Sequence, residues 1–280
     1  MKINFHFSPS FVIMNFLFAI IRFLPAAMGK ASLAAFTLAG RFLVYIFAGI
    51  SSSLTWLWHY LRKDVLPEPK AAIFKIFIWG MLISFPVFLI ELGLSSALIE
   101  LNFSGLAAKI LYWFVAIALV EEVFKYLIVK SKILNNPVFD EPTDVMIYMV
   151  VAAMGFAGLE NILYIWAPFE EIFAISEVLN RALVIGFIRF IGATFLHAVC
   201  SGMLGYFVAL SLNKPKIKLE LTALGLTIAI FLHGLYNFSI IEIGGPLKLA
   251  IPIIILVGLA TFVSLGFRHL KKMKSVCKVN

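Results

Sequence analysis

The chain has 280 residues, of which 62% are hydrophobic and only 14% are charged, and its mean hydropathy is +1.02. A soluble domain is about half apolar and about a quarter charged, so this composition excludes an ordinary soluble protein and predicts several spans of about 20 apolar residues. The net charge of +8 does not indicate a nucleic-acid partner, because the basic residues cluster in short loops and in the C-terminal tail, as in integral membrane proteins.

The apolar segments are continuous rather than alternating, and lipid offers the backbone no hydrogen-bond partner, so we predict membrane-spanning helices. Residues 11–27 are apolar apart from Asn15 and Arg22. They form an additional span, an interfacial helix or a poor signal peptide, and we favour the span. The expected fold is therefore all-α, a polytopic transmembrane helical bundle with seven to eight spans. The other seven predicted spans, in chain order, are 41–61, 71–99, 106–129, 144–168, 181–212, 219–238 and 246–268.

The charge of the connecting loops alternates along the chain. Loops 62–70, 130–143 and 213–220 are basic, whereas the intervening loops are acidic or neutral. Under the positive-inside rule, this alternation predicts a multi-pass protein of the cell membrane with its C-terminus in the cytoplasm. We divide the chain into an N-terminal segment (1–40), a helical bundle (41–268) and a basic cytoplasmic tail (269–280).

Four polar clusters interrupt the apolar spans, and an ionisable residue in lipid is a candidate functional residue because it costs several kcal/mol unless it is paired or solvated. In the first cluster, Glu121 and Glu122 are adjacent and therefore point ~100° apart on a helix. Lys125 follows at a spacing that allows it to pair with either carboxylate. The cluster is either a structural ion pair or the source of a general base that activates water, and we favour catalysis.

The second cluster, Glu160 and Asn161, lies in the middle of the predicted span 144–168. Glu160 has no charged residue three or four positions away in either direction, so its partner must come from another helix, a water molecule or a metal ion. A lone intramembrane glutamate is also compatible with a proton path.

The third and fourth clusters place histidines on consecutive spans. Arg189 lies two turns before His197, and Asn237 lies one turn beyond His233 on the same helix face. An amide in this position can donate to a developing oxyanion. Alternatively, two imidazoles and one carboxylate make a catalytic zinc set with an open position. No His-Glu-x-x-His motif is present, so a metal site built from Glu160, His197 and His233 is one hypothesis among others.

Taken in order, these motifs resemble those of the PrsW family of intramembrane proteases, over about residues 41–268. The stretch LWHYLRKDVLPEPKAAIFKIFIWGMLISFPVFLIELGL (57–94) is similar to the family's opening helices and Pro-Glu-Pro loop. The other matching stretches are VEEVFKYLIVK (120–130), FDEPTDVMIYMVVAAMGFAGLENILYI (139–165), RFIGATFLHAVCSGMLGYF (189–207) and LHGLYNF (232–238).

The resemblance implies a prokaryotic enzyme that cleaves membrane-anchored substrates, the family's best-known role being site-1 cleavage of an anti-sigma factor. The family is related to CAAX prenyl endopeptidases and bacteriocin-processing enzymes, which have a histidine at the position of Glu160. Glu160 therefore cannot play the same role here, and the choice between a metal-dependent and a purely glutamic mechanism stays open.

Carried over to this chain, the resemblance implies that Glu122 or Glu121 is the base and that His233 and Asn237 bind the oxyanion. Glu160 and His197 would orient the water or hold a metal, zinc or another divalent ion. Lys125, Asn161 and Arg189 would support them. No serine or cysteine nucleophile has a base at a suggestive spacing, so we expect no acyl-enzyme.

Two other classes of function remain as alternatives. A proton-coupled carrier would use Glu160 and the histidines as a relay, but it predicts inverted repeats and broken helices, and the sequence indicates neither. A catalytically silent relative would bind a membrane partner. In every case the expected partners are a membrane-anchored protein and lipid rather than nucleic acid.

Overall fold

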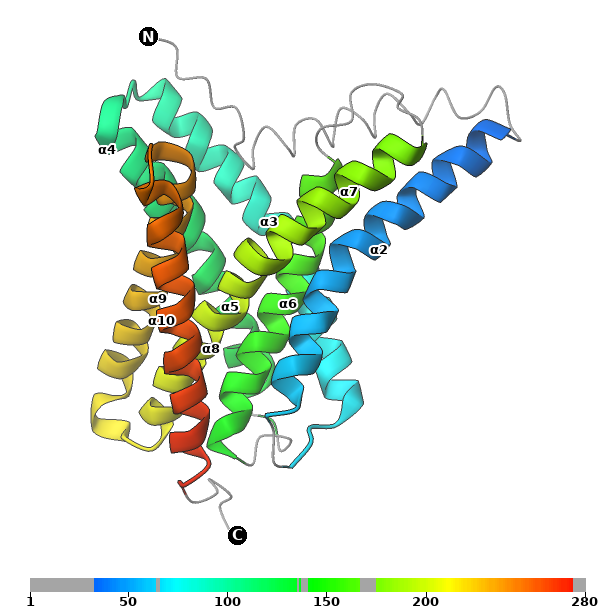
Figure 1. The fold of residues 1–280 in the computed structure, drawn as a ribbon. Coiled ribbons are helices and arrows are strands. Elements are labelled where there is room, and N and C mark those ends of the chain that lie inside the picture. Colours follow the sequence, from blue (N-terminus) through cyan, green and yellow to red (C-terminus); the bar gives the residue numbers. More distant parts are fainter. Residues whose placement is uncertain (1–32, 64–65, 135, 137–140, 167–174, 274–280) are drawn as a thin grey trace.

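The computed structural model describes residues 33–63, 66–134, 136, 141–166 and 175–273 (Figure 1). All regular structure within these residues is helical. The α-helices are α2 (Leu33–Leu61), α3 (Lys70–Glu100), α4 (Gly105–Ile110), α5 (Val120–Lys132), α6 (Pro142–Trp166), α7 (Ile175–Arg189), α8 (Phe195–Leu212), α9 (Lys218–Glu242) and α10 (Leu247–Leu270). Two π-helices, η1 (Leu111–Leu119) and η2 (Phe190–Thr194), and one short 3₁₀ helix, η3 (Pro215–Ile217), join them.

Five helical segments are long and apolar enough to cross a membrane, which confirms a multi-pass helical membrane protein. They are Lys70–Glu100, Pro142–Trp166, Ala182–Leu212, Pro215–Glu242 and Leu247–Leu270, and each overlaps a predicted span.

The predicted count of seven to eight spans is not confirmed. The segments 41–61 and 106–129 are both helical, in α2 and in the continuous run α4–η1–α5, but neither is among the five helices that are apolar enough and poor enough in charge to cross a membrane. In the second of them, the charges of the first polar cluster reduce the hydropathy. The remaining predicted span, 11–27, lies outside the described residues.

Helix α6 is the centre of the bundle, and nearly all its side chains are buried. It packs against α2, α3 and α8, and it also contacts α5 and α7 (Figure 1). Small residues permit this crowding, because they let helix backbones approach closely in lipid. As a consequence, Glu160 and Asn161 near the end of α6 are enclosed by protein rather than exposed to lipid.

Helices α3 and α6 cross at a contact between their backbones. A Cβ atom on Gly80 would overlap the carbonyl oxygen of Ala152, and a Cβ atom on Gly155 would overlap the carbonyl oxygen of Phe77. Because a backbone carbonyl cannot move aside as a flexible side chain can, glycine is required on both sides of this crossing.

We predict that Gly80→Ala destabilises the protein by about 1–3 kcal/mol, as overpacking typically does. Gly93→Ala is the matched control, because it is the same substitution on α3 at a position where a new Cβ meets nothing within 4 Å. Unfolding of the purified proteins in mixed detergent micelles measures both. Equal stability of the two variants would contradict the crossing described here.

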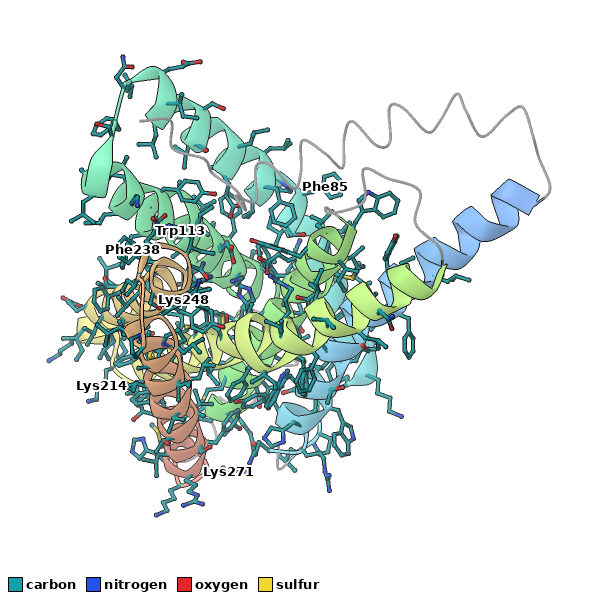
Figure 2. All side chains as sticks on the ribbon, turned by 45° about the horizontal axis from the view of Figure 1, so that its top comes forward. Phe85, Trp113, Lys214, Phe238, Lys248 and Lys271 are labelled. Atoms are coloured by element: carbon teal, nitrogen blue, oxygen red, sulfur yellow. The ribbon has the colours of Figure 1, made fainter. Side chains whose placement is uncertain are left out.

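Helices α2 and α7 pack along each other and diverge from α9 and α10 toward the top of Figure 1. Basic side chains gather at the opposite end. Figure 2 shows Lys214, which follows α8, and Lys271, which follows α10, at that end of the bundle, whereas Lys248 lies at the other end of α10. The basic residues that follow α8 and α10 therefore lie at the same end of the bundle, and the side of the membrane on which this end lies stays a prediction.

Candidate active site

The two π-helices adjoin the polar clusters. Helix η1 ends two residues before Glu121, and η2 lies between Arg189 and His197. A π-helix shifts its hydrogen bonds to i→i+5 and is rare outside functional sites. Both π-helices therefore change the direction in which the following side chains point, and these side chains include Glu121 and His197.

The Lys125 ammonium occupies the centre of the site. Its Nζ lies 2.9 Å from Glu121 Oε2, 2.9 Å from Glu122 Oε1 and 2.8 Å from His197 Nδ1, and all four side chains are buried. The same Nζ lies 4.5 Å from the centre of the Phe156 ring. An ammonium group only donates hydrogen bonds, so His197 Nδ1 accepts and the ring proton is on Nε2.

Glu160 finds its partners on two other helices. His197 Nε2 donates to Glu160 Oε2 at 2.9 Å, and Arg189 Nη2 forms an ion pair with the same oxygen at 2.8 Å. Arg189 Nε also donates to Asn161 Oδ1 at 2.6 Å, while Asn161 Nδ2 donates to the Gly49 carbonyl at 3.1 Å. The expected partner from another helix is therefore found. Asn161 fixes Arg189, and Arg189 in turn holds the carboxylate that orients His197.

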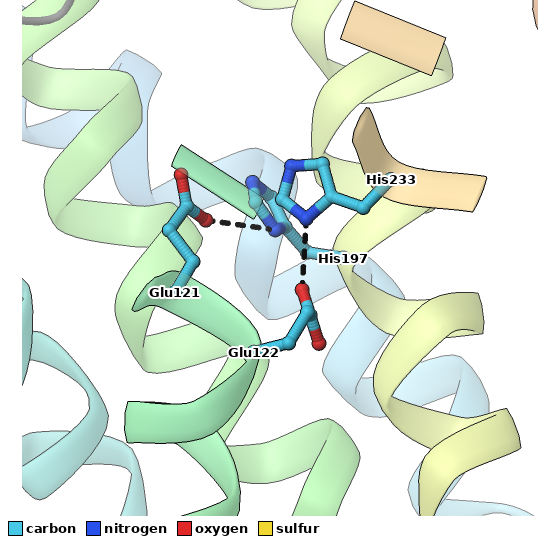
Figure 3. Close-up of side chains that lie close together, drawn as sticks. All are labelled: Glu121, Glu122, His197 and His233. Atoms are coloured by element: carbon cyan, nitrogen blue, oxygen red, sulfur yellow. Dashed lines mark hydrogen bonds and ion pairs between the residues drawn. The ribbon is translucent and has the colours of Figure 1, made fainter. Parts of the chain in front are cut away.

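Glu122 joins the second histidine to the site. Its Oε1 lies 2.9 Å from His233 Nδ1, and its Oε2 lies 3.5 Å from Ser201 Oγ. The rings of His197 and His233 stand nearly perpendicular, with their centres 5.1 Å apart. Figure 3 shows the two glutamates of α5 facing the two histidines of α8 and α9. Three helices thus supply one compact set of carboxylate and imidazole groups.

The described residues contain one group whose donor atoms converge as metal ligands do. One donor atom from each of Glu121, Glu122, His197 and His233 lies within 4.8 Å of the others. Glu160, which the sequence analysis placed in the metal set, is outside this group because Arg189 and His197 Nε2 hold its carboxylate. Imidazole and carboxylate donors suit zinc and related divalent ions, so the residues fit the metal hypothesis with this changed ligand set.

A cavity of about 250 Å³ opens beside the cluster. Glu121, His197 and His233 reach its wall, whereas Glu122 and Lys125 lie behind it. Asn237 also lines the cavity, and it makes no hydrogen bond to another described residue. Apolar side chains complete the wall, among them Trp113, Ile117, Ile188, Leu196 and Ile240. The cavity therefore combines a carboxylate, two imidazoles and an unpaired amide with an apolar lining.

Glu91 on α3 is the residue that the sequence analysis missed. Its side chain is fully buried, and neither carboxylate oxygen has a hydrogen-bond partner among the described residues. The charges of Glu121, Glu160 and Lys125 act on it, so it borders the same site. The sequence could have indicated Glu91, because it lies in the apolar segment FLIELGL (88–94) and a glutamate within a membrane span is a candidate functional residue.

We predict that Arg189→Met lowers the site's activity by about 10- to 100-fold, the usual effect of removing a residue that orients a ligand or base. Arg189→Lys should recover only part of the loss, since lysine keeps the charge but cannot hold Glu160 and Asn161 at once. The measurement is the turnover rate of purified variants with equal folded fractions. Full activity of Arg189→Met would contradict the positioning role.

The sequence of this chain is similar to those of known proteins over the region that contains the site. The family described as PrsW family intramembrane metalloprotease matches residues 68–265. A protein named Protease PrsW from Oceanobacillus iheyensis is 29% identical over 191 residues, 68% of this chain and 80% of the relative. The protein of that name from Clostridioides difficile is 30% identical over 199 residues (70% and 78%), and that from Bacillus subtilis is 24% identical over 233 residues (82% and 96%). No solved structure matches the chain.

Proposed function

Because the chain belongs to the PrsW family of intramembrane metalloproteases, we propose that it hydrolyses a peptide bond in or near the membrane-spanning segment of a membrane-anchored regulatory protein. The chain is an intramembrane protease, and what supports the finer proposal is one observation. Glu121, Glu122, His197 and His233 converge next to a cavity that also exposes the Asn237 amide. A water molecule and a peptide carbonyl therefore have a place beside both a base and an oxyanion donor.

We assign the base to Glu121. It lines the cavity, whereas Glu122 is fully buried behind the wall and is held by Lys125 and His233. A general base must come within hydrogen-bond reach of the proton it abstracts, and the cavity that Glu121 lines offers room for a water molecule. Glu122 then acts by fixing His233 and Lys125.

The other side chains orient the reactants. Lys125 holds the Glu121 carboxylate, and Glu160 holds His197 with its Nδ1 turned toward the base. On the same wall, the Asn237 amide donates to the oxyanion that forms when water attacks the carbonyl carbon. A carboxylate only accepts hydrogen bonds, so His233 donates to Glu122 through Nδ1. The Nε2 atom of a neutral ring then has a lone pair, which can bind a metal ion but cannot donate to the oxyanion, and Asn237 is the oxyanion donor. The product amine then receives the proton that Glu121 removed from water.

A metal ion fits this scheme with Glu122, His197 and His233 as its ligands and Glu121 left as the base. Two histidines and a glutamate with one open position form a known type of catalytic zinc site. When bound there, zinc or another divalent ion would supply a Lewis acid for the substrate carbonyl.

The membrane arrangement is part of the proposal. The predicted seven to eight spans would require α2 and the run α4–η1–α5 to cross the bilayer in addition to the five apolar helices. The basic residues after α8 and α10 favour a cytoplasmic C-terminus. In this orientation the substrate's membrane segment would reach the cavity from the lipid.

A co-expression screen tests the proposed function. Tagged single-span membrane proteins from the same genome are paired with the wild type, Glu121→Gln and His197→Ala, at equal membrane levels. A truncated product that appears only with the wild type supports the proposal and identifies a substrate. A product that persists with both variants comes from a host protease and removes the support for this site.

A further inference from the structure

The Lys125 ammonium lies where a metal ion would bind. It contacts Glu121 Oε2, Glu122 Oε1 and His197 Nδ1 at 2.8–2.9 Å, and these side chains belong to the convergent donor group. Glu122 and His197, two of the three proposed metal ligands, would turn the same lone pairs toward a divalent ion. A monovalent ammonium and a divalent ion repel each other strongly at such short range in a buried site, so both cannot use the donors together.

We propose that Lys125 and a divalent metal ion are alternative occupants of one donor set, and that Glu91 receives the Lys125 ammonium when the metal enters. The inference rests on the proposed metal-assisted function, and it assigns Glu91 a role as a positioning residue. Lys125 would hold the site together in the metal-free protein and move aside on loading.

Glu91 lies where such an acceptor is needed. Phe88, one turn before Glu91 on α3, packs against Phe156 with ring centres 6.0 Å apart, and Lys125 Nζ lies over the same Phe156 ring at 4.5 Å. Phe156 thus packs against both Lys125 of α5 and the turn of α3 that leads to Glu91, and α3 and α5 pack directly against each other. The lysine side chain is flexible, and rotation about its bonds is the movement that the exchange requires.

The missing partner of Glu91 is what calls for an explanation. A buried carboxyl group with both oxygens unpaired is unfavourable, and no described residue provides a structural reason for it. Charge balance supplies one for the metal-loaded site. Ionised Glu91, Glu121, Glu122 and Glu160 carry four negative charges, and Lys125, Arg189 and one divalent ion carry four positive charges. Buried charges are tolerated when they are paired in this way.

Metal titration of the purified full-length protein in nanodiscs tests the exchange without any substrate. Co²⁺ is followed by its visible absorption, and Zn²⁺ by competition with a chelating dye. We expect Lys125→Met to bind at least ten times more tightly than the wild type, because the competing cation is gone. Glu91→Gln should bind at least ten times more weakly, because the displaced ammonium has no carboxylate. In the double variant the affinity should equal that of Lys125→Met.

Glu100→Gln, an exposed change at the end of the same helix, is the matched control and should bind like the wild type. Size-exclusion profiles and circular dichroism establish folding, and Lys125→Gln replaces Lys125→Met if the latter is unfolded. The inference is overturned if removal of Lys125 does not tighten binding, or if Glu91→Gln weakens binding equally with and without Lys125. Cleavage by the same wild-type preparation is scored separately, so cleavage without metal binding overturns this inference and leaves the protease intact.

Discussion

Glu121→Gln is expected to reduce the cleavage rate by about a thousandfold while leaving the bundle folded. A positioned general base contributes about 10²–10⁴ to a rate, and Gln cannot remove a proton from water. Its amide oxygen still accepts from Lys125, which lies 2.9 Å from Glu121 Oε2, so the buried network keeps a partner. The measurement is the rate of product formation by purified enzyme, with thermal unfolding of both proteins as the folding control.

The variant Glu122→Gln distinguishes the roles of the two adjacent carboxylates. It should also lower the rate, but by loosening His233, whose Nδ1 lies 2.9 Å from Glu122 Oε1. We therefore expect a stability loss in Glu122→Gln that Glu121→Gln does not show. Glu100 is exposed at the end of α3, so Glu100→Gln should be fully active. If Glu121→Gln keeps more than a tenth of the wild-type rate, the base is a different group.

His197→Ala is expected to lower the rate by about a thousandfold as well. The imidazole is the link between two halves of the site, since its Nδ1 accepts from Lys125 and its Nε2 donates to Glu160. Its removal takes one of three hydrogen-bond partners from the Lys125 ammonium and leaves the Glu160 carboxylate to Arg189. The gap lets Lys125 and Glu121 shift, and one proposed metal ligand is lost.

The control for His197→Ala is His269→Ala at the end of α10. Among the described residues, His269 has an exposed hydrogen bond to Tyr206 and does not line the cavity, so its loss should leave the rate unchanged. A readout of metal content on the same samples distinguishes a ligand from a residue that only orients the base. If His197→Ala cleaves the substrate at the wild-type rate, His197 has no part in the mechanism.

Helix type and the main apolar spans could be predicted because composition alone determines them. A segment such as 246–268 has too few polar groups to be soluble and no alternation that would favour a strand. The corresponding α10 runs from Leu247 to Leu270. A membrane span is harder to predict where an apolar segment also carries the charged residues of the candidate site, as 106–129 does.

Contacts between helices could be predicted only in part. Spacing along a helix reveals partners three or four residues away, so the pairing of Lys125 with Glu121 and Glu122 was foreseeable. The choice of Arg189 and His197 as partners of Glu160 depends on how three helices rotate about their axes, which the π-helices change. For the same reason the convergent donor group contains Glu121 and Glu122 in place of Glu160.

The most direct test of the proposed chemistry is cleavage in proteoliposomes that contain only purified enzyme and one tagged single-span substrate, with the products identified by mass spectrometry. We predict that the wild type produces two fragments whose new termini lie in or beside the membrane segment, and that Glu121→Gln and His197→Ala produce neither. Equal yields of the same fragments from the wild type and both variants would contradict a site built on Glu121 and His197.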